Sequence, residues 1–111
     1  MTLLSFQTSI TGDTAVVALS GELDVAGSAQ LDSELDRAIE DHAPKTIVLD
    51  LSDLGFMDST GLRLVVLADA RARAEGRRLA LVRGSDPVHR VFEITRMADR
   101  LDFVASRDDV A

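Results

Sequence analysis

Short apolar segments rich in β-branched residues alternate along the chain with longer segments of helical period. The strand-like segments are residues 3–10, 14–21, 46–51, 78–82 and, near the C-terminus, 103–105. Turn-forming residues 11–13 join the first two, which predicts an antiparallel pair. Each later strand is separated from the one before it by a helical segment. This alternation restricts the chain to an α/β fold.

The helical segments have recognisable faces and ends. In the first, residues 21–42, the apolar positions recur at i, i+4, i+7 and i+8, which predicts one face of an amphipathic helix: Leu31, Leu35, Ala38 and Ile39. The second, residues 61–76, ends at Gly76, a residue type that favours the position after a helix. The third begins with Asp86 as the predicted N-cap and Pro87 at the first helical position.

The predicted element order is β-β-α-β-α-β-α, in one domain over residues 1–111, with helices packed on a mixed sheet of four to five strands. The two strand–helix–strand units should each be parallel crossovers. Three loops, residues 21–24, 55–62 and 83–89, then lie at one edge of the sheet, which is the usual functional edge in such folds. Asp24 and Ser59 are therefore expected to be neighbours.

The segment from Leu54 to Val66, LGFMDSTGLRLVV, contains the most informative polar residues. Asp58, Ser59 and Thr60 are all good N-cap residues, and one of them is expected to cap the second helix. A capping box cannot form, because neither Gly61 nor Leu62 can return the hydrogen bond. Capping alone would explain one of these residues, so the roles of the other two stay open.

A second hypothesis makes Ser59 a nucleophile. Such a serine needs a base and an oriented third group. His89 is predicted at the same edge of the sheet, whereas His42 ends the first helix at the opposite edge. The segment does not match the G-x-S-x-G nucleophile elbow, and its resemblance to the Asp-Thr-Gly of aspartic proteases is in the wrong register.

A third hypothesis makes Ser59 a phosphate acceptor. A helix N-terminus favours an anion, and a phosphate would add about −1.5 to −2 charge there. With Asp24 and Asp58 nearby, a bound partner would then be repelled, while Arg63, one turn further on, could partly compensate in the free protein. The first turns of the second helix are apolar on more than one face. The apolar residues that do not face the sheet are either exposed for docking or covered by the C-terminal segment.

The composition excludes several classes of function. The net charge is −7, with 19 acidic and 12 basic residues, which argues against a nucleic-acid partner. There is no Cys, so disulfides and thiolate metal sites are excluded. No segment approaches the ~20 apolar residues of a membrane span. No phosphate-binding loop or metal cluster is evident, so we expect no cofactor and no metal.

Three segments together resemble the STAS domain, and within it the bacterial anti-sigma-factor antagonists. They are LSGELD after the second strand, IVLDLSDLGFMDSTGL around Ser59, and PVHRVFEITRM in the third helix. The likeness extends over nearly the whole chain. It implies a STAS fold and a cytoplasmic partner-switching role in transcription regulation.

In this family the unphosphorylated protein binds an anti-sigma factor that is itself a serine kinase, and so releases a sigma factor. The resemblance implies phosphorylation at Ser59, which ends the complex, and a serine phosphatase that restores it. It also implies a partner-binding surface, made of Asp24, Asp58, Ser59, Thr60, Gly61, Leu62 and Arg63. The protein would then be a substrate and binder and not an enzyme, with no direct contact to nucleic acid or membrane.

Two alternatives stay open. The chain could be a non-enzymatic STAS subunit of a transporter-associated or sensor complex, since such relatives share the fold. The chain could also be a small hydrolase that uses Ser59 and His89.

Overall fold

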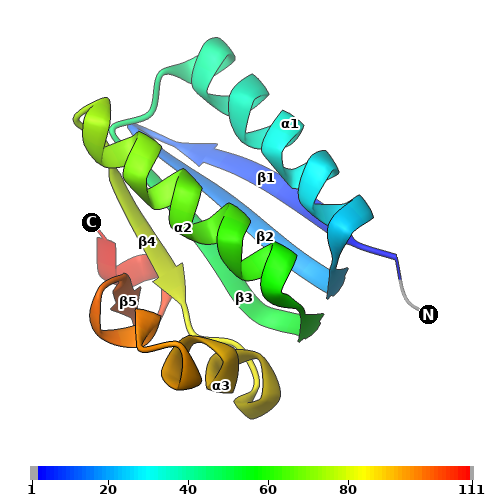
Figure 1. Ribbon diagram of the computed structural model, residues 1–111. Coiled ribbons are helices and arrows are strands. Elements are labelled where there is room, and N and C mark those ends of the chain that lie inside the picture. Colours follow the sequence, from blue (N-terminus) through cyan, green and yellow to red (C-terminus); the bar gives the residue numbers. More distant parts are fainter. Residues whose placement is uncertain (1–2, 111) are drawn as a thin grey trace.

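The computed structural model describes residues 3–110, which form one mixed sheet with three α-helices (Figure 1). The strands are β1 (Ser5–Thr11), β2 (Thr14–Leu23), β3 (Thr46–Met57), β4 (Arg78–Val82) and β5 (Asp102–Val104). The helices are α1 (Val25–His42), α2 (Ser59–Ala74) and α3 (Asp86–Ile94), with short 3₁₀ helices η1 (Met97–Asp99) and η2 (Arg107–Val110). The predicted order of strands and helices is confirmed.

The strands lie in their order along the chain, β1-β2-β3-β4-β5. β1 pairs antiparallel with β2, and the β2–β3, β3–β4 and β4–β5 pairs are all parallel, as the crossover argument predicts. The parallel strands therefore all end at the same edge of the sheet. The starts of α1, α2 and α3 follow directly from the ends of β2, β3 and β4 at that edge (Figure 1).

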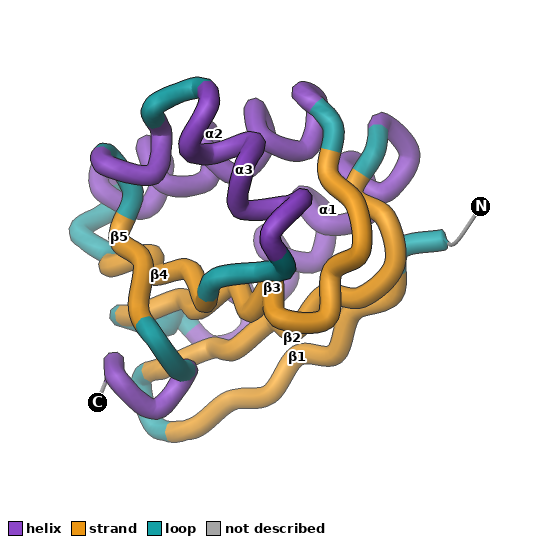
Figure 2. The backbone as a smooth tube through the Cα atoms, turned by 90° about the horizontal axis from the view of Figure 1, so that it is seen from below, coloured by secondary structure: helices purple, strands orange, loops and turns teal. Residues whose placement is uncertain are grey.

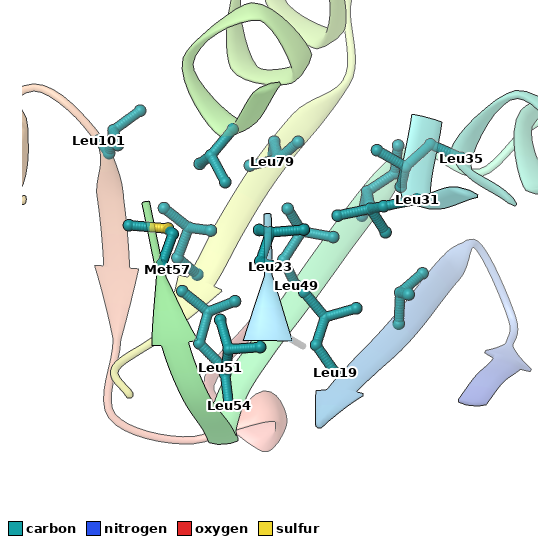
Figure 3. Close-up of a cluster of buried hydrophobic side chains, with 14 of the residues drawn as sticks. Leu19, Leu23, Leu31, Leu35, Leu49, Leu51, Leu54, Met57, Leu79 and Leu101 are labelled. Atoms are coloured by element: carbon teal, nitrogen blue, oxygen red, sulfur yellow. The ribbon is translucent and has the colours of Figure 1, made fainter. Parts of the chain in front are cut away.

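All three α-helices cover one face of the sheet (Figure 2). The main core lies between them and contains Leu49 and Leu51 of β3 together with Leu31 and Leu35 of α1 (Figure 3). The predicted apolar face of α1 is confirmed, because three of its four positions are buried and Ile39 is partly buried. Burial of these leucines is the main force that holds the helices on the sheet.

The C-terminal segment covers part of the other face of the sheet, which we call the outer face (Figure 2). There Val16, Val48 and Val82 form a second buried cluster, and Val110 of η2 packs against it. β3 is thus covered on both faces, as is usual for a central parallel strand, and its residues Ile47–Leu51 are all buried. η2 lies on the face opposite α2 (Figure 2), and the contact that the C-terminal residues make with α2 is at its end, where Arg73 Nη2 donates to the Arg100 carbonyl at 3.1 Å. This contact leaves Leu67 of α2 55% exposed.

An ion pair fixes this segment. The Arg107 guanidinium donates to the carboxylate of the buried Asp50 in β3, with Nε 3.1 Å from Oδ2. Burial acts to raise the pKa of Asp50, but hydrogen bonds from the Ser52 hydroxyl and N–H, together with Arg107, outweigh it and hold that pKa below its ordinary value. This ionised carboxylate therefore stabilises the attachment of η2 to the sheet.

Several predicted bounds are wrong. β3 continues to Met57, whereas the sequence analysis ends this strand at residue 51 and assigns residues 55–57 to a loop. The extension pairs with the end of β2 across two register shifts. The N-cap of α3 is Ser85, not Asp86, which is already helical and pairs with Arg83 at 3.1 Å. The last strand runs one residue earlier than predicted.

Within residues 3–110, no helix has both the length and the apolar character that crossing a bilayer requires.

Candidate functional site

Asp58 caps α2. Its backbone is extended (φ −99°, ψ −174°), and its carboxylate accepts a hydrogen bond from the Gly61 N–H at 3.0 Å. Of the three residues that could cap this helix, the structure therefore uses Asp58. Ser59 is the first residue of α2 and its side chain is exposed. Between residues 3 and 110 no protein group forms a hydrogen bond with its hydroxyl, so capping does not account for the serine.

Asp24 has the same role at α1. Its backbone is also extended (φ −115°, ψ −165°), and its carboxylate accepts from the Gly27 N–H at 2.9 Å. The sheet brings the two caps together, because Leu23 is in register with Met57 and the Asp58 N–H donates to the Leu23 carbonyl at 3.3 Å. Asp24 and Asp58 thus follow directly on two adjacent, paired strand ends. The prediction that the segments of Asp24 and Ser59 lie next to each other at one edge of the sheet is therefore confirmed.

Gly61 allows the start of α2 to lie directly on the end of β2. A Cβ at this position would come within 2.6 Å of the Leu23 carbonyl oxygen and 2.8 Å of Met57 Cγ. Both distances are shorter than real contacts of a Cβ, so a larger residue would push α2 away from the strands. Gly61 is buried, and its role at this edge is to set the spacing of the backbone.

The other predicted site residues differ in exposure. Thr60 and Leu62 are half-buried, and Leu62 packs against the main core. Arg63 is exposed and forms no ion pair with any residue that the structure describes. The site thus presents one exposed hydroxyl, that of Ser59, beside the half-buried Thr60. Two capping carboxylates flank it at the ends of adjacent strands, and one cation, Arg63, that is unpaired among the described residues lies a turn further along α2.

His89 does not form a catalytic arrangement with Ser59. Its ring packs edge-on against Phe103, with centroids 4.9 Å apart, and lies 6.2 Å from the Phe92 ring. Its Nδ1 is buried and has no hydrogen-bond partner among residues 3–110, so no carboxylate in this part of the chain holds that nitrogen. α3 places this ring against Phe103 of the C-terminal strand and not in solvent, where a histidine in the first turn of a helix usually lies. The residues of a serine hydrolase are not assembled in this geometry.

The surplus apolar surface of α2 lies partly in the open. Val65 is fully buried on the sheet, whereas Leu67, two residues further, is 55% exposed. Leu67 borders a groove of about 350 Å³ between α1 and α2, whose other wall includes Ser28 and Leu35 of α1. Sequence analysis missed this groove, although a helix with more than one apolar face is the signal that points to it.

We find no group of three or more His, Cys, Asp or Glu side chains arranged to hold a metal ion in the part of the chain that the structure describes.

Comparison with known proteins identifies the family. The family model described as "Mlab, STAS domain" matches residues 6–105. The anti-sigma F factor antagonist of Paenibacillus polymyxa is 35% identical over 80 residues, which are 72% of this chain and 68% of that protein.

Solved structures agree with this family. The unphosphorylated form of the anti-sigma factor antagonist SpoIIAA aligns with a TM-score of 0.80 and 29% identity, over 96% of this chain and 93% of that one. The phosphorylated form of the Bacillus cell fate determinant SpoIIAA aligns with a TM-score of 0.73 and 28% identity, over 96% of each chain. With its fold, its motifs and these relatives in agreement, the chain belongs to the STAS-domain family, in the group of anti-sigma factor antagonists.

Proposed function

We propose that this protein binds an anti-sigma factor in its unphosphorylated form and thereby releases a sigma factor, and that phosphorylation of Ser59 switches the binding off. The names of the relatives support the first part, since the P. polymyxa protein is an anti-sigma F factor antagonist. The existence of unphosphorylated and phosphorylated forms of SpoIIAA, at 29% and 28% identity, supports the second.

The observation that carries the proposal is the free hydroxyl of Ser59. Because Asp58 supplies the cap, the Ser59 side chain stays exposed at the start of α2. A kinase could reach it without unfolding any part of the domain. In the transfer, a bond forms between Ser59 Oγ and the γ-phosphorus of ATP while the bond to the bridging oxygen of ADP breaks. The hydroxyl proton passes to a base of the kinase.

Charge explains how the phosphate would act. The unphosphorylated edge carries the carboxylates of Asp24 and Asp58, each held by a backbone N–H. A phosphate on Ser59 adds about −1.5 to −2 charge beside them. A partner whose surface is complementary to the hydroxyl form would then have to bury an uncompensated double charge. The free protein tolerates the same phosphate, because it lies at a helix N-terminus in contact with water.

Three partners follow from this proposal: an anti-sigma factor with serine kinase activity, a serine phosphatase that restores the hydroxyl, and indirectly the sigma factor. Nucleotide and magnesium would be bound by the kinase. Because a sigma factor acts on RNA polymerase, we propose the bacterial cytoplasm as the place of action, with no direct contact to nucleic acid or membrane.

The direct test is labelling. Incubation of the protein with its cognate kinase and ATP should add one phosphate, detected by intact mass, and Ser59→Ala should abolish it. Ser85→Ala is the matched control, because Ser85 is also an exposed serine at a helix start on the same edge of the sheet. This control should keep full labelling. Equal labelling of wild type and Ser59→Ala would contradict the assignment of the site.

The test also separates the alternatives. A cognate partner that binds the protein but never phosphorylates it would favour a subunit of a transporter-associated or sensor complex. Turnover of ester substrates that is lost in both Ser59→Ala and His89→Ala would favour a hydrolase, against the geometry of His89.

A further inference from the structure

β1 is the outermost strand on one side of the sheet, and among residues 3–110 no backbone group pairs with its free side (Figure 2). In an antiparallel pair, alternate residues direct their N–H and C=O groups away from the neighbouring strand. β1 pairs with β2 over its whole length, Ser5–Thr11, without a register shift. Its free side is therefore a regular row of hydrogen-bond donors and acceptors, which is complementary to another extended strand.

The other side of the sheet is protected against such pairing. β5, the outermost strand there, has only three residues and is flanked by η1 and η2. It also carries a charge, on Asp102, which pairs with Arg78 at 2.6 Å. Proteins use short strands, charged side chains, proline and bulges to keep outermost strands from pairing with other chains. β1, with the sequence SFQTSIT and its regular register, has none of these features.

A second copy of β1 fits the free side of the first. When two β1 strands overlap fully in antiparallel order, Thr8 lies opposite Thr8 of the other copy, and Phe6 lies opposite Ile10. Phe6 packs against the main core, so both residues are on the face that the helices cover. Ile10 is 37% exposed in the single chain, and this pairing would cover it with an aromatic ring. Pairs of aromatic and β-branched residues stabilise antiparallel strands.

Charge favours β1 as the place where two copies meet. The net charge of the chain is −7, so two copies repel each other over most of their surface. None of the seven residues of β1 is charged, although 28% of the whole chain is. On the neighbouring α1, Glu34 accepts a hydrogen bond from Thr8 at 2.6 Å and pairs with Arg37 at 3.0 Å, which neutralises this carboxylate within each copy. Two β1 strands can therefore pair without placing like charges opposite each other.

We propose that two copies of the protein associate through β1, in antiparallel order and centred on Thr8, so that their two five-stranded sheets become one continuous sheet. The contact is narrow, because seven residues at about 3.4 Å each span only roughly 24 Å. It buries less than the roughly 1,200 Å² of a stable interface, so the dimer is weak and reversible, with a Kd on the order of 0.1 mM.

The dimer leaves both candidate sites open. Because the two β1 strands run in opposite directions, the edges that carry Ser59 lie at opposite ends of the joined sheet. Each copy can then bind its own partner there. The association does not rest on the proposed function, and either can fail without the other.

A dilution series of the ¹⁵N-labelled protein, followed by nuclear magnetic resonance, tests the association between about 2 mM and about 20 µM, a range that brackets the expected Kd. The amide shifts of residues 5–11 should change together with concentration and fit a single Kd. Translational diffusion should be slower at the high end of the range.

Paired substitutions on the outer face test the register. Ser9 is in register with Val16 of the outer-face cluster, and Gln7 lies two residues away on the same face, opposite Ser9 of the other copy. The double-lysine variant, Gln7→Lys with Ser9→Lys, places like charges opposite each other and should weaken the association at least about tenfold. The double-glutamate variant, Gln7→Glu with Ser9→Glu, should lose it as well. An equimolar mixture of the two variants should regain it. Both positions are exposed, so both variants should fold, which thermal denaturation checks.

Ala70→Lys with Ala74→Lys is the matched control. Both alanines are exposed on α2, which packs over β3 and β4 away from β1. This control adds the same charge as the double-lysine variant and should associate at least as tightly as wild type. Mixed with the double-glutamate variant, it should not restore association, which separates pairing at β1 from general attraction.

Several results would overturn the proposal: shifts that do not depend on concentration up to about 2 mM, association that persists in the double-lysine variant, or concentration-dependent shifts confined to another surface. If the protein does not self-associate but the double-lysine variant weakens the anti-sigma complex, β1 is a docking strand for that partner and the dimer proposal is wrong.

Discussion

Gly61→Ala tests how closely α2 must approach the sheet. The added methyl would lie 2.6 Å from the Leu23 carbonyl oxygen, the same atom that accepts the Asp58 N–H, and 2.8 Å from Met57 Cγ. Overpacking of this kind costs roughly 1–3 kcal/mol. Replacing glycine by alanine in a helix raises the free energy of unfolding by up to about 1 kcal/mol, because alanine has the higher helix propensity. The net expectation is a loss of about 1–2 kcal/mol in the free energy of unfolding.

Urea denaturation followed by far-ultraviolet circular dichroism measures this loss, and the melting temperature should fall by about 4–8 °C. Gly55→Ala is the matched control. A Cβ there meets only the Gly21 carbonyl oxygen at 3.5 Å, an ordinary contact, so stability should stay within about 0.5 kcal/mol or rise slightly. If Gly61→Ala is as stable as Gly55→Ala, the close contact between α2 and β2 does not constrain this edge, and our account of Gly61 is wrong.

Three further predictions concern single carboxylates and the serine itself. Asp58→Ala should lose about 1 kcal/mol of stability by removing the cap, while Asp58→Asn should keep most of it, as thermal denaturation can show. Ser59→Ala should change stability by less than about 0.5 kcal/mol, because the side chain is exposed; a larger loss would assign the serine a structural role. Since the pKa of Asp50 is lowered in the folded state, its stabilising effect should be present above the ordinary carboxyl pKa, about 4, and should disappear as the pH falls through the folded value. The urea midpoint of Asp50→Asn should therefore lie below that of wild type at about pH 7, and the two midpoints should converge as the pH falls to about 2. The midpoint of the control Asp53→Asn, at an exposed position, should stay close to that of wild type over the same range.

The sequence predicts the arrangement of the elements well, because periodicity and crossover rules act locally. The apolar face of α1 follows from the periodicity within one segment. The parallel pairing of β2, β3 and β4 follows from the handedness rule for a strand–helix–strand unit. The end of β3 is missed because Ser52, Asp53 and Gly55 are typical of a loop. In the structure these residues continue a strand, since its pairing with β2 is maintained across two register shifts.

The candidate site is predicted only in part, for a similar reason. The sequence places Asp24 and Asp58 at one edge, but three adjacent residues can cap α2 equally well. Only the observed bond from the Gly61 N–H to Asp58 shows that Ser59 remains free. The pairing of Asp50 with Arg107 joins residues 57 positions apart, and no local pattern could predict it.

The measurement that tests the central claim most directly is the affinity of the cognate anti-sigma factor for the protein in two states, with Ser59 free and with Ser59 phosphorylated. Calorimetric titration should give a Kd that rises by at least about a hundredfold on phosphorylation, or about 2.7 kcal/mol. Ser59→Ala should bind nearly as tightly as the free form, and Ser59→Glu should fall between the two states. Equal Kd values for the phosphorylated and unphosphorylated protein would contradict the account.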